Sequence, residues 1–596
     1  MKNIFCLIVD ATSYQYMHDG YGTTPFLDEL SKKSHACKNV FSQGPYTEAA
    51  LTPFYTGRDN LDGGGNYFRG EETPKNMFEA FSEAGYDVLN FTQPLIYPTP
   101  MGRGINEARY GVAYFFSAVW DYRISYYKPL FDEGKMQERD FDHIYRLLNG
   151  NFEFWLQYLT DCKEGAPTAE FINRYANPKA YDFEKNIASV RKEYDDFLKD
   201  RRGYVTELLK KGEGHSVFSI PKYEMDYKSD DERLYQELAV ERKAFFKKLA
   251  KFNKKHNKNS EGRLCHTLKS AVKSACKGNR EAVISALKKH YYFRKLCNTK
   301  AEIKSLFEKR SNYKPEPSIM EYFRYFQDWE RARNSDKPYF CMMHVSDLHT
   351  PEIFFSIDSQ DKGLINAELD EATAYLQGLP KDFQGNVGYN LSLHYVDGCI
   401  KRIYEWLEKT GKFEDTLFVI SADHGSSFRY APLRDSLVNN RHEENYHIPC
   451  IFYGQGIQPT ENANYYTTKD IVKTMLVASG APSADFQGAD ILSGTPQSYA
   501  ITEYLGGGCP DIFRKPLLLT VRNEGYCVGI SRKLSEDFSR EQIVCVYDRK
   551  NDPLERRNIV GETEFEKIEL LVAVANARFD QIKAQAEEKL VLYQTR

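Results

Sequence analysis

The sequence predicts an α/β protein built on a doubly wound, mainly parallel sheet. Short continuous apolar runs recur along the chain, and runs of this kind are typical of strands buried on both faces. Helical segments separate them, and such alternation is typical of a doubly wound sheet. A composition of 41% hydrophobic and 28% charged residues indicates a soluble globular protein with ample core. The expected parallel strands are 4–9, 86–93, 338–347 and 416–425.

Helix signals support this order of elements. The segment "TTPFLDELSKK" follows the first strand, and in it Thr24 is suited to cap a helix and Pro25 to occupy its first position. Asp28 then favours the positive end of that helix. The segment "YVDGCIKRIYEWLEKTG" predicts a second helix, between the last two parallel strands.

Between about 105 and 335 the pattern changes to long, charged, Tyr- and Lys-rich helical stretches, which predict a helical insertion into the α/β core. One piece, 243–258, is rich in lysine and places Phe245, Leu249 and Phe252 on one helix face. Its charge has two interpretations. It is either a solvated helical surface, or a basic lid for an anionic substrate or a lipid headgroup.

After about residue 497, short alternating strands predict a small antiparallel sheet, and a charged helix over 562–590 closes the chain. The expected organisation therefore has four parts: a first part of the core at 1–104, the basic insertion at 105–335, a second part of the core with the metal site at 336–496, and the antiparallel sheet with its terminal helix at 497–596.

Bulk properties exclude several classes of function. A net charge of −4 gives no global attraction to nucleic acid or membranes. The apolar run Ile4–Val9 is too short for the core of a signal peptide, and no run of about 18 apolar residues indicates a membrane span. The 12 cysteines are scattered singly, as expected of reduced thiols. We therefore expect a cytoplasmic protein without a membrane span or a nucleic-acid partner; the oligomeric state is not predicted.

Polar residues follow several of the expected strands. Asp10, His344, Asp423 and His424 fall at carboxyl ends of strands, where chemistry gathers in parallel sheets. Gly425 follows the adjacent Asp-His pair, and so small a residue lets another group approach closely. An Asp-His pair with a remote strand-end Asp predicts a divalent metal site with mixed oxygen and imidazole ligands.

The segment "GPYTEAALTPFYTGR" leads from a turn into a short helix and exposes the hydroxyl of Thr47. This residue is either a plain helix cap or a nucleophile. A hydroxyl is too weak an acid to ionise at neutral pH unless a cation lowers its pKa, so a nearby metal favours the nucleophile. Thr52 is a rival, because Pro53 at a first helical position would make Thr52 an equally good cap.

The order of these pieces resembles the sulfatase branch of the alkaline phosphatase superfamily. The resemblance spans nearly the whole chain outside the insertion. It rests on the segments "IFCLIVDATS", "TTPFLDELSKKSHACKNVFSQ", "HVSDLHTP", "YNLSLHYVDGCIKRIYEWLEKTGKFEDTLFVISADHG", "HIPCIFYGQG" and "VYDRKNDPLERRNI".

The resemblance implies roles for particular residues. In the family the nucleophile lies ten residues before the glycine of a Thr-Gly pair, and this offset leads to Thr47. By position, Asp10, Asp423 and His424 would bind the metal, with Thr47 bridging it to the substrate. His349 would contact the transferred group or protonate the leaving oxygen.

Three further histidines are implied in substrate binding. His344 would help to line the pocket, unless it is a core histidine. His447, or the nearby His442, would face the substrate from the opposite side, unless His447 is structural.

The sequence also departs from the family pattern. Sulfatases carry Cys or Ser in C/S-x-P-x-R, which becomes formylglycine, whereas this chain reads "TEAAL" from Thr47. A threonine at this position is similar to that of the phosphoethanolamine and phosphoglycerol transferases and the lipoteichoic acid synthases. Ala11 replaces the usual second Asp. Asp347 has Pro351 in place of the His that two-metal relatives carry, so we expect one divalent ion, with Mn²⁺ favoured and Mg²⁺, Ca²⁺ and Zn²⁺ possible.

We therefore predict a metal-dependent transferase of phosphoethanolamine or phosphoglycerol type, or a phosphodiesterase, that acts through a phosphothreonine intermediate. Its substrate would be a phosphate-ester small molecule or a glycan- or lipid-linked ester. The alternatives are a sulfuric ester hydrolase and a non-catalytic binding protein of the same fold.

Overall fold

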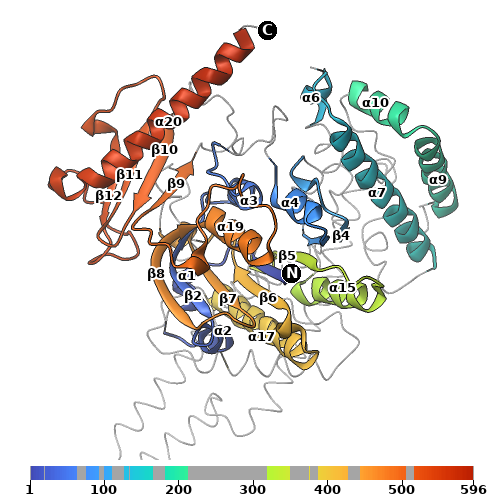
Figure 1. The fold of residues 1–596 in the computed structure, drawn as a ribbon, viewed down its shortest axis with the longest axis horizontal. Coiled ribbons are helices and arrows are strands. Elements are labelled where there is room, and N and C mark those ends of the chain that lie inside the picture. Colours follow the sequence, from blue (N-terminus) through green and yellow to red (C-terminus); the bar gives the residue numbers. More distant parts are fainter. Residues whose placement is uncertain are drawn as a thin grey trace, which may run out of the picture.

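The computed structural model describes residues 2–18, 20–62, 75–92, 100–109, 127–132, 134–164, 182–211, 318–348, 375, 387–426, 443–504 and 516–594. Within these ranges the chain forms a large central sheet with helices on both faces, a separate small sheet, and a group of helices on the far flank (Figure 1).

The central sheet has eight strands in the order β4-β3-β5-β1-β6-β7-β2-β8. Seven of them run in the same direction, and β7 alone runs antiparallel to both of its neighbours. The predicted doubly wound, mainly parallel sheet is confirmed. Its strands are β1 Asn3–Val9, β2 His35–Phe41, β3 Asp87–Phe91, β4 Glu107–Arg109, β5 Tyr339–Val345, β6 Thr416–Ser421, β7 His447–Tyr453 and β8 Thr460–Thr467.

Alternate residues of the central strand β1 face two separate hydrophobic cores, because successive side chains of a strand point to opposite faces. Ile4, Cys6 and Ile8 join the core beneath α3, α4 and α19. Phe5 and Leu7 join the core beneath α2, α15 and α17. The covering helices are α2 Pro25–Ser31, α3 Thr47–Thr56, α4 Met77–Glu83, α15 Ile319–Ala332, α17 Val387–Lys409 and α19 Thr468–Ser479.

The C-terminal part forms a four-stranded antiparallel sheet in the order β12-β11-β10-β9, as expected. The terminal helix packs on it through Leu571, Ala575 and Phe579 (Figure 1). The bounds are β9 Ala500–Tyr504, β10 Leu517–Arg522, β11 Tyr526–Arg532, β12 Ile543–Asp548 and α20 Glu569–Gln594.

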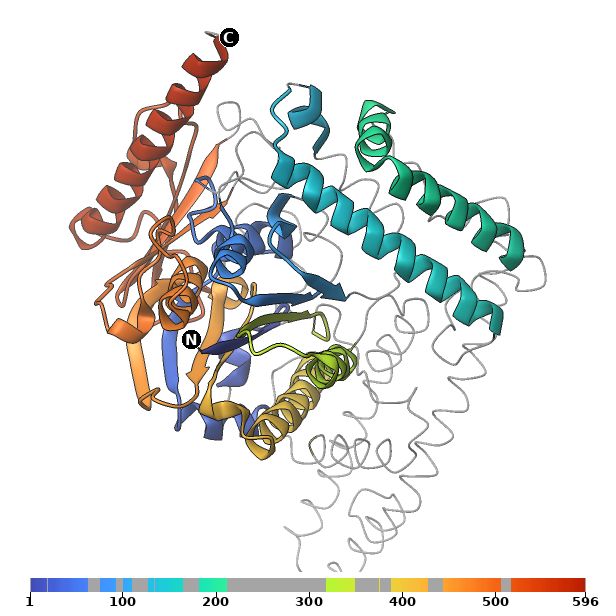
Figure 2. The ribbon, with the colours of Figure 1, turned by 45° about the vertical axis from the view of Figure 1, so that its right-hand side comes forward.

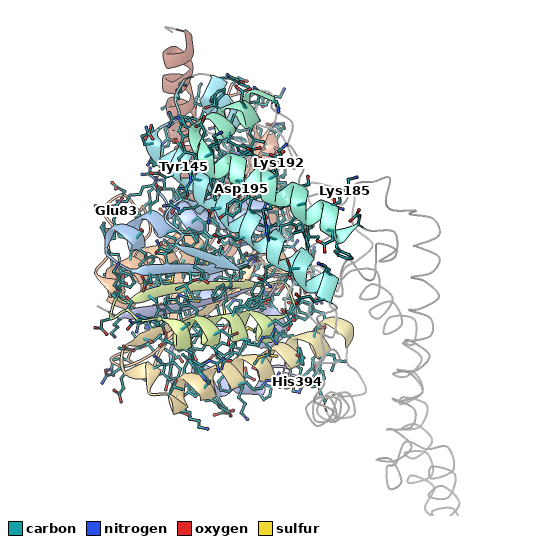
Figure 3. The ribbon with its side chains drawn as sticks, turned by 90° about the vertical axis from the view of Figure 1, so that its right-hand side faces the viewer. Glu83, Tyr145, Lys185, Lys192, Asp195 and His394 are labelled. Atoms are coloured by element: carbon teal, nitrogen blue, oxygen red, sulfur yellow. The ribbon has the colours of Figure 1, made fainter. Side chains whose placement is uncertain are left out.

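Helices of the expected insertion lie on the flank opposite the four-stranded sheet (Figure 2). Arg103 anchors this group, because it bridges Glu79 on α4 and Asp140 on α7. Seen from this side, α9 carries the exposed Lys185 and Lys192 (Figure 3). The helices described here are α6 Lys128–Asp132, α7 Glu138–Glu164, α9 Phe183–Lys199 and α10 Arg201–Lys211.

Both ends of the range expected for the insertion contain parts of the core. β4 pairs with β3 at the edge of the central sheet, and α15 packs on its face through Tyr322 and Phe326. The sequence suggested neither, because β4 has only three residues and α15 is as charged as the insertion helices. The lysine-rich segment 243–258 lies outside the described residues. Among the helices that are described, none combines the length and apolar character needed to cross a bilayer.

Candidate metal and catalytic centre

The register of the sheet brings the first two predicted metal ligands together. β1 and β6 run parallel with Ile8 opposite Ser421, so Asp10 and Asp423, each two residues further on, reach the same height on the same face. The N–H of Ala11 donates to Oδ1 of Asp423 at 3.2 Å, which ties the two strand ends together. Both carboxylates are almost fully buried.

Ala11 links these strand ends in a strained conformation. Its φ of 60° lies in the left-handed region, which a residue with a Cβ rarely adopts. Its carbonyl accepts a hydrogen bond of 2.7 Å from the Tyr389 hydroxyl, and the same hydroxyl accepts one of 3.2 Å from the N–H of Ser13. Contacts from α17 thus hold a backbone turn at the candidate site that costs on the order of 1–3 kcal/mol.

His424 faces both carboxylates from the loop after β6. Its Nδ1 lies 2.7 Å from the carbonyl of Gly425, an arrangement that assigns the proton to Nδ1 and leaves a lone pair on Nε2. That Nε2 lies 3.4 Å from Oδ1 of Asp10 and 3.6 Å from Oδ2 of Asp423. The expected strand 416–425 ends earlier, at Ser421, so the Asp-His pair belongs to a loop.

Thr47 enters this group from the start of α3. It is the first helical residue, and Tyr46 is the N-cap, so the interpretation of Thr47 as a plain cap is wrong. Its Oγ1 lies 3.3 Å from Nε2 of His424, and the residue is 7% exposed. The rival Thr52 lies inside the helix, because Pro53 is an interior residue and does not begin it.

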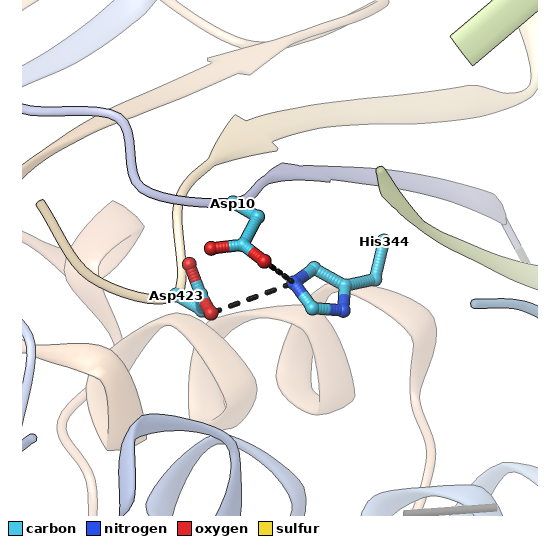
Figure 4. A group of neighbouring side chains, drawn as sticks. All are labelled: Asp10, His344 and Asp423. Carbon is cyan, nitrogen blue, oxygen red and sulfur yellow. Dashed lines mark ion pairs between the residues drawn. The ribbon is translucent and has the colours of Figure 1, made fainter. Parts of the chain in front are cut away.

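His344 also belongs to this group. Its Nε2 lies 3.5 Å from Oδ2 of Asp423 and 3.9 Å from Oδ2 of Asp10 (Figure 4). Thr92 Oγ1 fixes Nδ1 at 3.2 Å. The three ligand atoms of His344, Asp10 and Asp423 lie within 4.8 Å of one another. We expected His344 to line the substrate pocket or to be a core histidine; its ring points between the two carboxylates. We call Asp10, His344, Asp423 and His424 the strand-end cluster.

The strand-end cluster fits a divalent cation. Donor atoms that share one ion through bonds of about 2.1 Å lie about 3–4 Å apart, which matches its distances of 3.4–3.9 Å. Oδ2 of Asp423 and Nε2 of His344 are buried and have no hydrogen-bond partner among the described residues. Burial raises the pKa of Asp423, but His424 and His344 outweigh it and hold the pKa below its ordinary value. Carboxylate and imidazole donors are typical of Mn²⁺ or Zn²⁺ sites.

Comparison with known proteins assigns the chain to a family. A family model described as Sulfatase matches residues 2–261 and 264–481. The chain belongs to the sulfatase family.

Several solved structures are similar to this sulfatase-family chain. One is a protein of the alkaline phosphatase superfamily from Vibrio parahaemolyticus, with 12% identity, a TM-score of 0.44, and coverage of 100% of this chain and 87% of that one. Another, solved with its substrate D-glucosamine-2-N,6-O-disulfate, has 14% identity, a TM-score of 0.44 and coverage of 98% of each chain. A phosphonate monoester hydrolase from Silicibacter pomeroyi has 13% identity, a TM-score of 0.43, and coverage of 97% and 95%.

The other histidines predicted at the site of this sulfatase-family chain are His349, His442 and His447. His349 and His442 lie outside the described residues. His447 is buried, and both ring nitrogens face protein oxygens: Nε2 lies 2.6 Å from the carbonyl of Lys38, and Nδ1 lies 2.8 Å from Oε1 of Glu443. These contacts favour the structural interpretation of His447 over contact with substrate.

Two sequence features at this edge serve the fold. The carboxylate of Asp347 accepts hydrogen bonds of 3.1–3.3 Å from the N–H of Ile319, so it stabilises the start of α15. Gly425 does permit a close approach, but by the chain itself: a Cβ there would lie 1.9 Å from the carbonyl oxygen of Glu444.

Proposed function

We propose that this sulfatase-family chain is a metal-dependent phosphoryl or phospho-alcohol transferase, or a phosphodiesterase, in which Thr47 is the nucleophile. The observation that carries the proposal is the distance of 3.3 Å between Thr47 Oγ1 and His424 Nε2, beside the buried carboxylates of Asp10 and Asp423. A threonine that served only the helix would have no reason to adjoin such a cluster.

The position of Thr47 at the start of α3 suits an anionic substrate. The first-turn N–H groups of a helix lack acceptors within the helix, and the helix dipole adds partial positive charge there. A phosphate group is favoured at such an end. Thr47 therefore has its hydroxyl where a phosphoryl group would bind.

Asp10, His344, Asp423, His424 and the Thr47 hydroxyl are the groups that would hold the cation. A bound divalent cation would lower the pKa of the hydroxyl and neutralise negative charge that builds on the phosphoryl oxygens. Within that frame, the chain itself orients Oγ1. The N-terminal backbone of α3 fixes Thr47, and the Nδ1 contact of His424 with Gly425 keeps Nε2 turned toward it.

The reaction then has two displacements. Thr47 Oγ1 releases its proton to water and forms a bond to phosphorus while the bond from phosphorus to the leaving alcohol breaks, and His349 is the proposed proton donor to that alcohol. Water or an acceptor alcohol next attacks the phosphothreonine, with His349 as the proposed acceptor of its proton. The bond from phosphorus to Thr47 Oγ1 breaks, and Oγ1 takes up a proton from water. Water gives hydrolysis and an alcohol gives transfer, so the same residues serve both outcomes.

Mass spectrometry of a quenched reaction tests the nucleophile. Incubation with Mn²⁺ and bis-p-nitrophenyl phosphate, followed by acid quenching, should leave a phospho-adduct on the peptide that contains Thr47. A Thr47→Ala protein should show none, whereas a matched Thr52→Ala protein should keep the adduct. An adduct that survives the Thr47→Ala substitution would overturn the assignment.

A sulfuric ester hydrolase is the second candidate, because family membership favours it. The threonine at position 47 opposes it, since formylglycine arises from Cys or Ser and its hydrate can release sulfate by elimination, which a threonine cannot do. Turnover of p-nitrophenyl sulfate that exceeds turnover of p-nitrophenyl phosphate and its diester would favour this candidate. Failure to turn over all three esters, with and without metal, would favour a non-catalytic binding protein.

A further inference from the structure

One short helix contacts the loops that carry Asp10, His424 and Thr47. This helix, α18, spans Glu443–Tyr446 and directly precedes β7. The N–H of Gly425 donates to the carbonyl of Asn445 at 2.8 Å, and Gly425 adjoins His424. The loop after β6 is therefore tied to α18.

The other two loops bind the same helix. Ser13 Oγ, three residues beyond the first ligand of the strand-end cluster, donates to the carbonyl of Glu444 at 2.6 Å. The N–H of Ser42, five residues before the proposed nucleophile, donates to the carbonyl of Tyr446 at 2.7 Å. Three successive carbonyls of α18 thus receive hydrogen bonds from three loops far apart in sequence.

The loops also bind one another at α18. The N–H of Ser426 donates to Ser13 Oγ at 2.7 Å, which joins the loops after β1 and β6. Because a Cβ at position 425 would lie 1.9 Å from the carbonyl oxygen of Glu444, no larger residue fits there unless α18 moves away. The position of α18 and the position of the His424 loop are therefore mutually dependent.

The side chain of Glu443 fastens α18 to the four-stranded sheet. Its Oε1 accepts a hydrogen bond of 2.8 Å from Arg549, which follows β12, and its Oε2 lies 3.7 Å from Nε of Arg522 on β10. Arg522 in turn binds Glu555 through two hydrogen bonds of 2.9 and 3.0 Å. We call Glu443, Arg522, Arg549 and Glu555 the arginine–glutamate network.

The arginine–glutamate network is buried, and an aromatic ring packs against it. Glu443 is 2% exposed, and Arg522 and Glu555 are fully buried. The guanidinium of Arg549 lies over the ring of Phe41 at 5.2 Å, at the end of β2. Removal of one partner of a buried ion pair leaves the other charge uncompensated, so the network resists displacement of α18.

We propose that Glu443 and Arg549 are positioning residues through which the four-stranded sheet sets the placement of the three catalytic loops. The inference rests on the proposed function for its consequence in turnover, but its structural part does not depend on it. The C-terminal sheet then acts on the chemistry without touching substrate.

Amide hydrogen exchange tests the structural part directly. In Arg549→Met, peptides that contain the amides of Ser42 and Gly425 should exchange at least about tenfold faster than in wild type, because α18 is released. Arg578→Met is the matched control. Arg578 is also a buried arginine between the C-terminal sheet and the core, but it pairs with Asp62 and Glu503 and not with α18. Its substitution should leave those two amides at the wild-type rate.

Kinetics of the same proteins tests the consequence. With bis-p-nitrophenyl phosphate and Mn²⁺, Arg549→Met should lower kcat about tenfold, with KM changed less, while Arg578→Met should stay within about twofold of wild type. Arg549→Lys, which keeps the charge opposite Glu443, should restore part of both readouts and replaces Arg549→Met if that variant does not fold.

Equal exchange rates at Ser42 and Gly425 in the arginine 549 and 578 variants would overturn the inference. An inactive wild type with the expected exchange pattern would instead contradict only the proposed function. The two failures are therefore distinguishable.

Discussion

The strand-end cluster includes residues 423–424, and the arginine–glutamate network includes Glu443. Both are buried groups of charged residues, but different partners compensate their charges. In the arginine–glutamate network, each carboxylate receives a hydrogen bond from a guanidinium group. In the strand-end cluster, two carboxylates face two imidazoles, and Oδ2 of Asp423 and Nε2 of His344 approach to 3.5 Å without a hydrogen bond. The network pairs each carboxylate with a guanidinium, although Oε2 of Glu443 and Nε of Arg549 have no hydrogen-bond partner among the described residues. The strand-end cluster pairs its carboxylates with imidazoles and is suited to receive a cation.

This difference distinguishes buried charge that stabilises the fold from buried charge that is able to bind a ligand. Burial of a charge costs free energy unless a partner compensates it, so a buried cluster of metal-ligand side chains with unpaired donor atoms is a candidate for binding a further group. The two clusters are also connected, because α18 belongs to the network through Glu443 and binds the loops of the candidate site through its carbonyls.

The largest expected effect concerns the proposed nucleophile beside the strand-end cluster. Thr47→Ala should lower kcat/KM toward bis-p-nitrophenyl phosphate by at least about three orders of magnitude, because the covalent route closes. Steady-state kinetics with saturating Mn²⁺ measures it. Thr52→Ala, on the same helix, should stay within about threefold of wild type. Near-normal turnover of Thr47→Ala would leave Thr47 without a catalytic role.

The next effect concerns the cation itself. Wild type should bind about one Mn²⁺ per chain, and Asp423→Ala should weaken that binding about 100-fold, since it removes a buried anionic donor. His344→Ala should weaken it about tenfold. Calorimetric titration with Mn²⁺ alone measures both.

Asp347→Asn is the control for the Mn²⁺ titration. Asp347 is another buried strand-end acid, but it binds the N–H of Ile319, so its substitution should leave Mn²⁺ affinity unchanged. Undiminished binding in Asp423→Ala would rule out the strand-end cluster as the metal site.

A smaller effect concerns Glu443 in the arginine–glutamate network. Burial raises the pKa of Glu443, but Arg549 and His447, followed by Arg522, outweigh it and lower the pKa from 4.5 to about 2. Because the pKa is lower in the folded chain, ionised Glu443 stabilises the fold above about pH 4.5, and this contribution is lost as the pH falls toward 2. The free energy of unfolding should drop in that window by on the order of 3 kcal/mol from this group.

Glu443→Gln should flatten that dependence, although the variant is less stable at neutral pH. Urea unfolding at a series of pH values measures both proteins. The groups that face Glu443, which are Arg522, Arg549 and His447, and the second carboxylate of the network, Glu555, are unchanged in the variant and serve as the common background. If the free energy of unfolding changed with pH at the same slope in both proteins, the ionisation of Glu443 would not stabilise the fold.

The smallest expected effect is at Ala11. Ala→Gly in a helix costs about 1 kcal/mol, as expected for the matched variant Ala49→Gly in α3. Ala11→Gly should change the free energy of unfolding by less than about 0.5 kcal/mol, because relief of the positive φ offsets the loss of the methyl group. Thermal unfolding of both variants compares them, and a full 1 kcal/mol loss at Ala11 would show that its turn is not strained.

Much of the fold could be predicted because its signals are local. The apolar runs at 4–9, 86–93 and 338–347 are strands almost at the predicted bounds, and the terminal helix and the antiparallel sheet were expected. Strands β2 and β8 were not predicted, because their buried and exposed positions alternate irregularly around a break in register.

The alternation of side chains along β5 indicates where His344 lies. In β5 it lies two residues after Met342, which faces the core beneath α3, so His344 must face the same side as Asp10. Alternation along the strand therefore pointed to the strand-end cluster. The register that makes Ile8 and His344 neighbours became visible only in the sheet.

The sequence by itself determined which residue types stand at the strand ends and at the start of α3, because a strand or helix period depends on neighbours within a few residues. It also determined Asp10, Asp423, His424 and Thr47 as candidates. Only the tertiary structure decided that the carbonyls of Glu444 and Tyr446 in α18 accept hydrogen bonds from Ser13 and Ser42. Those contacts join residues hundreds of positions apart, and no local pattern encodes a hydrogen bond whose partner is set by the packing of two sheets.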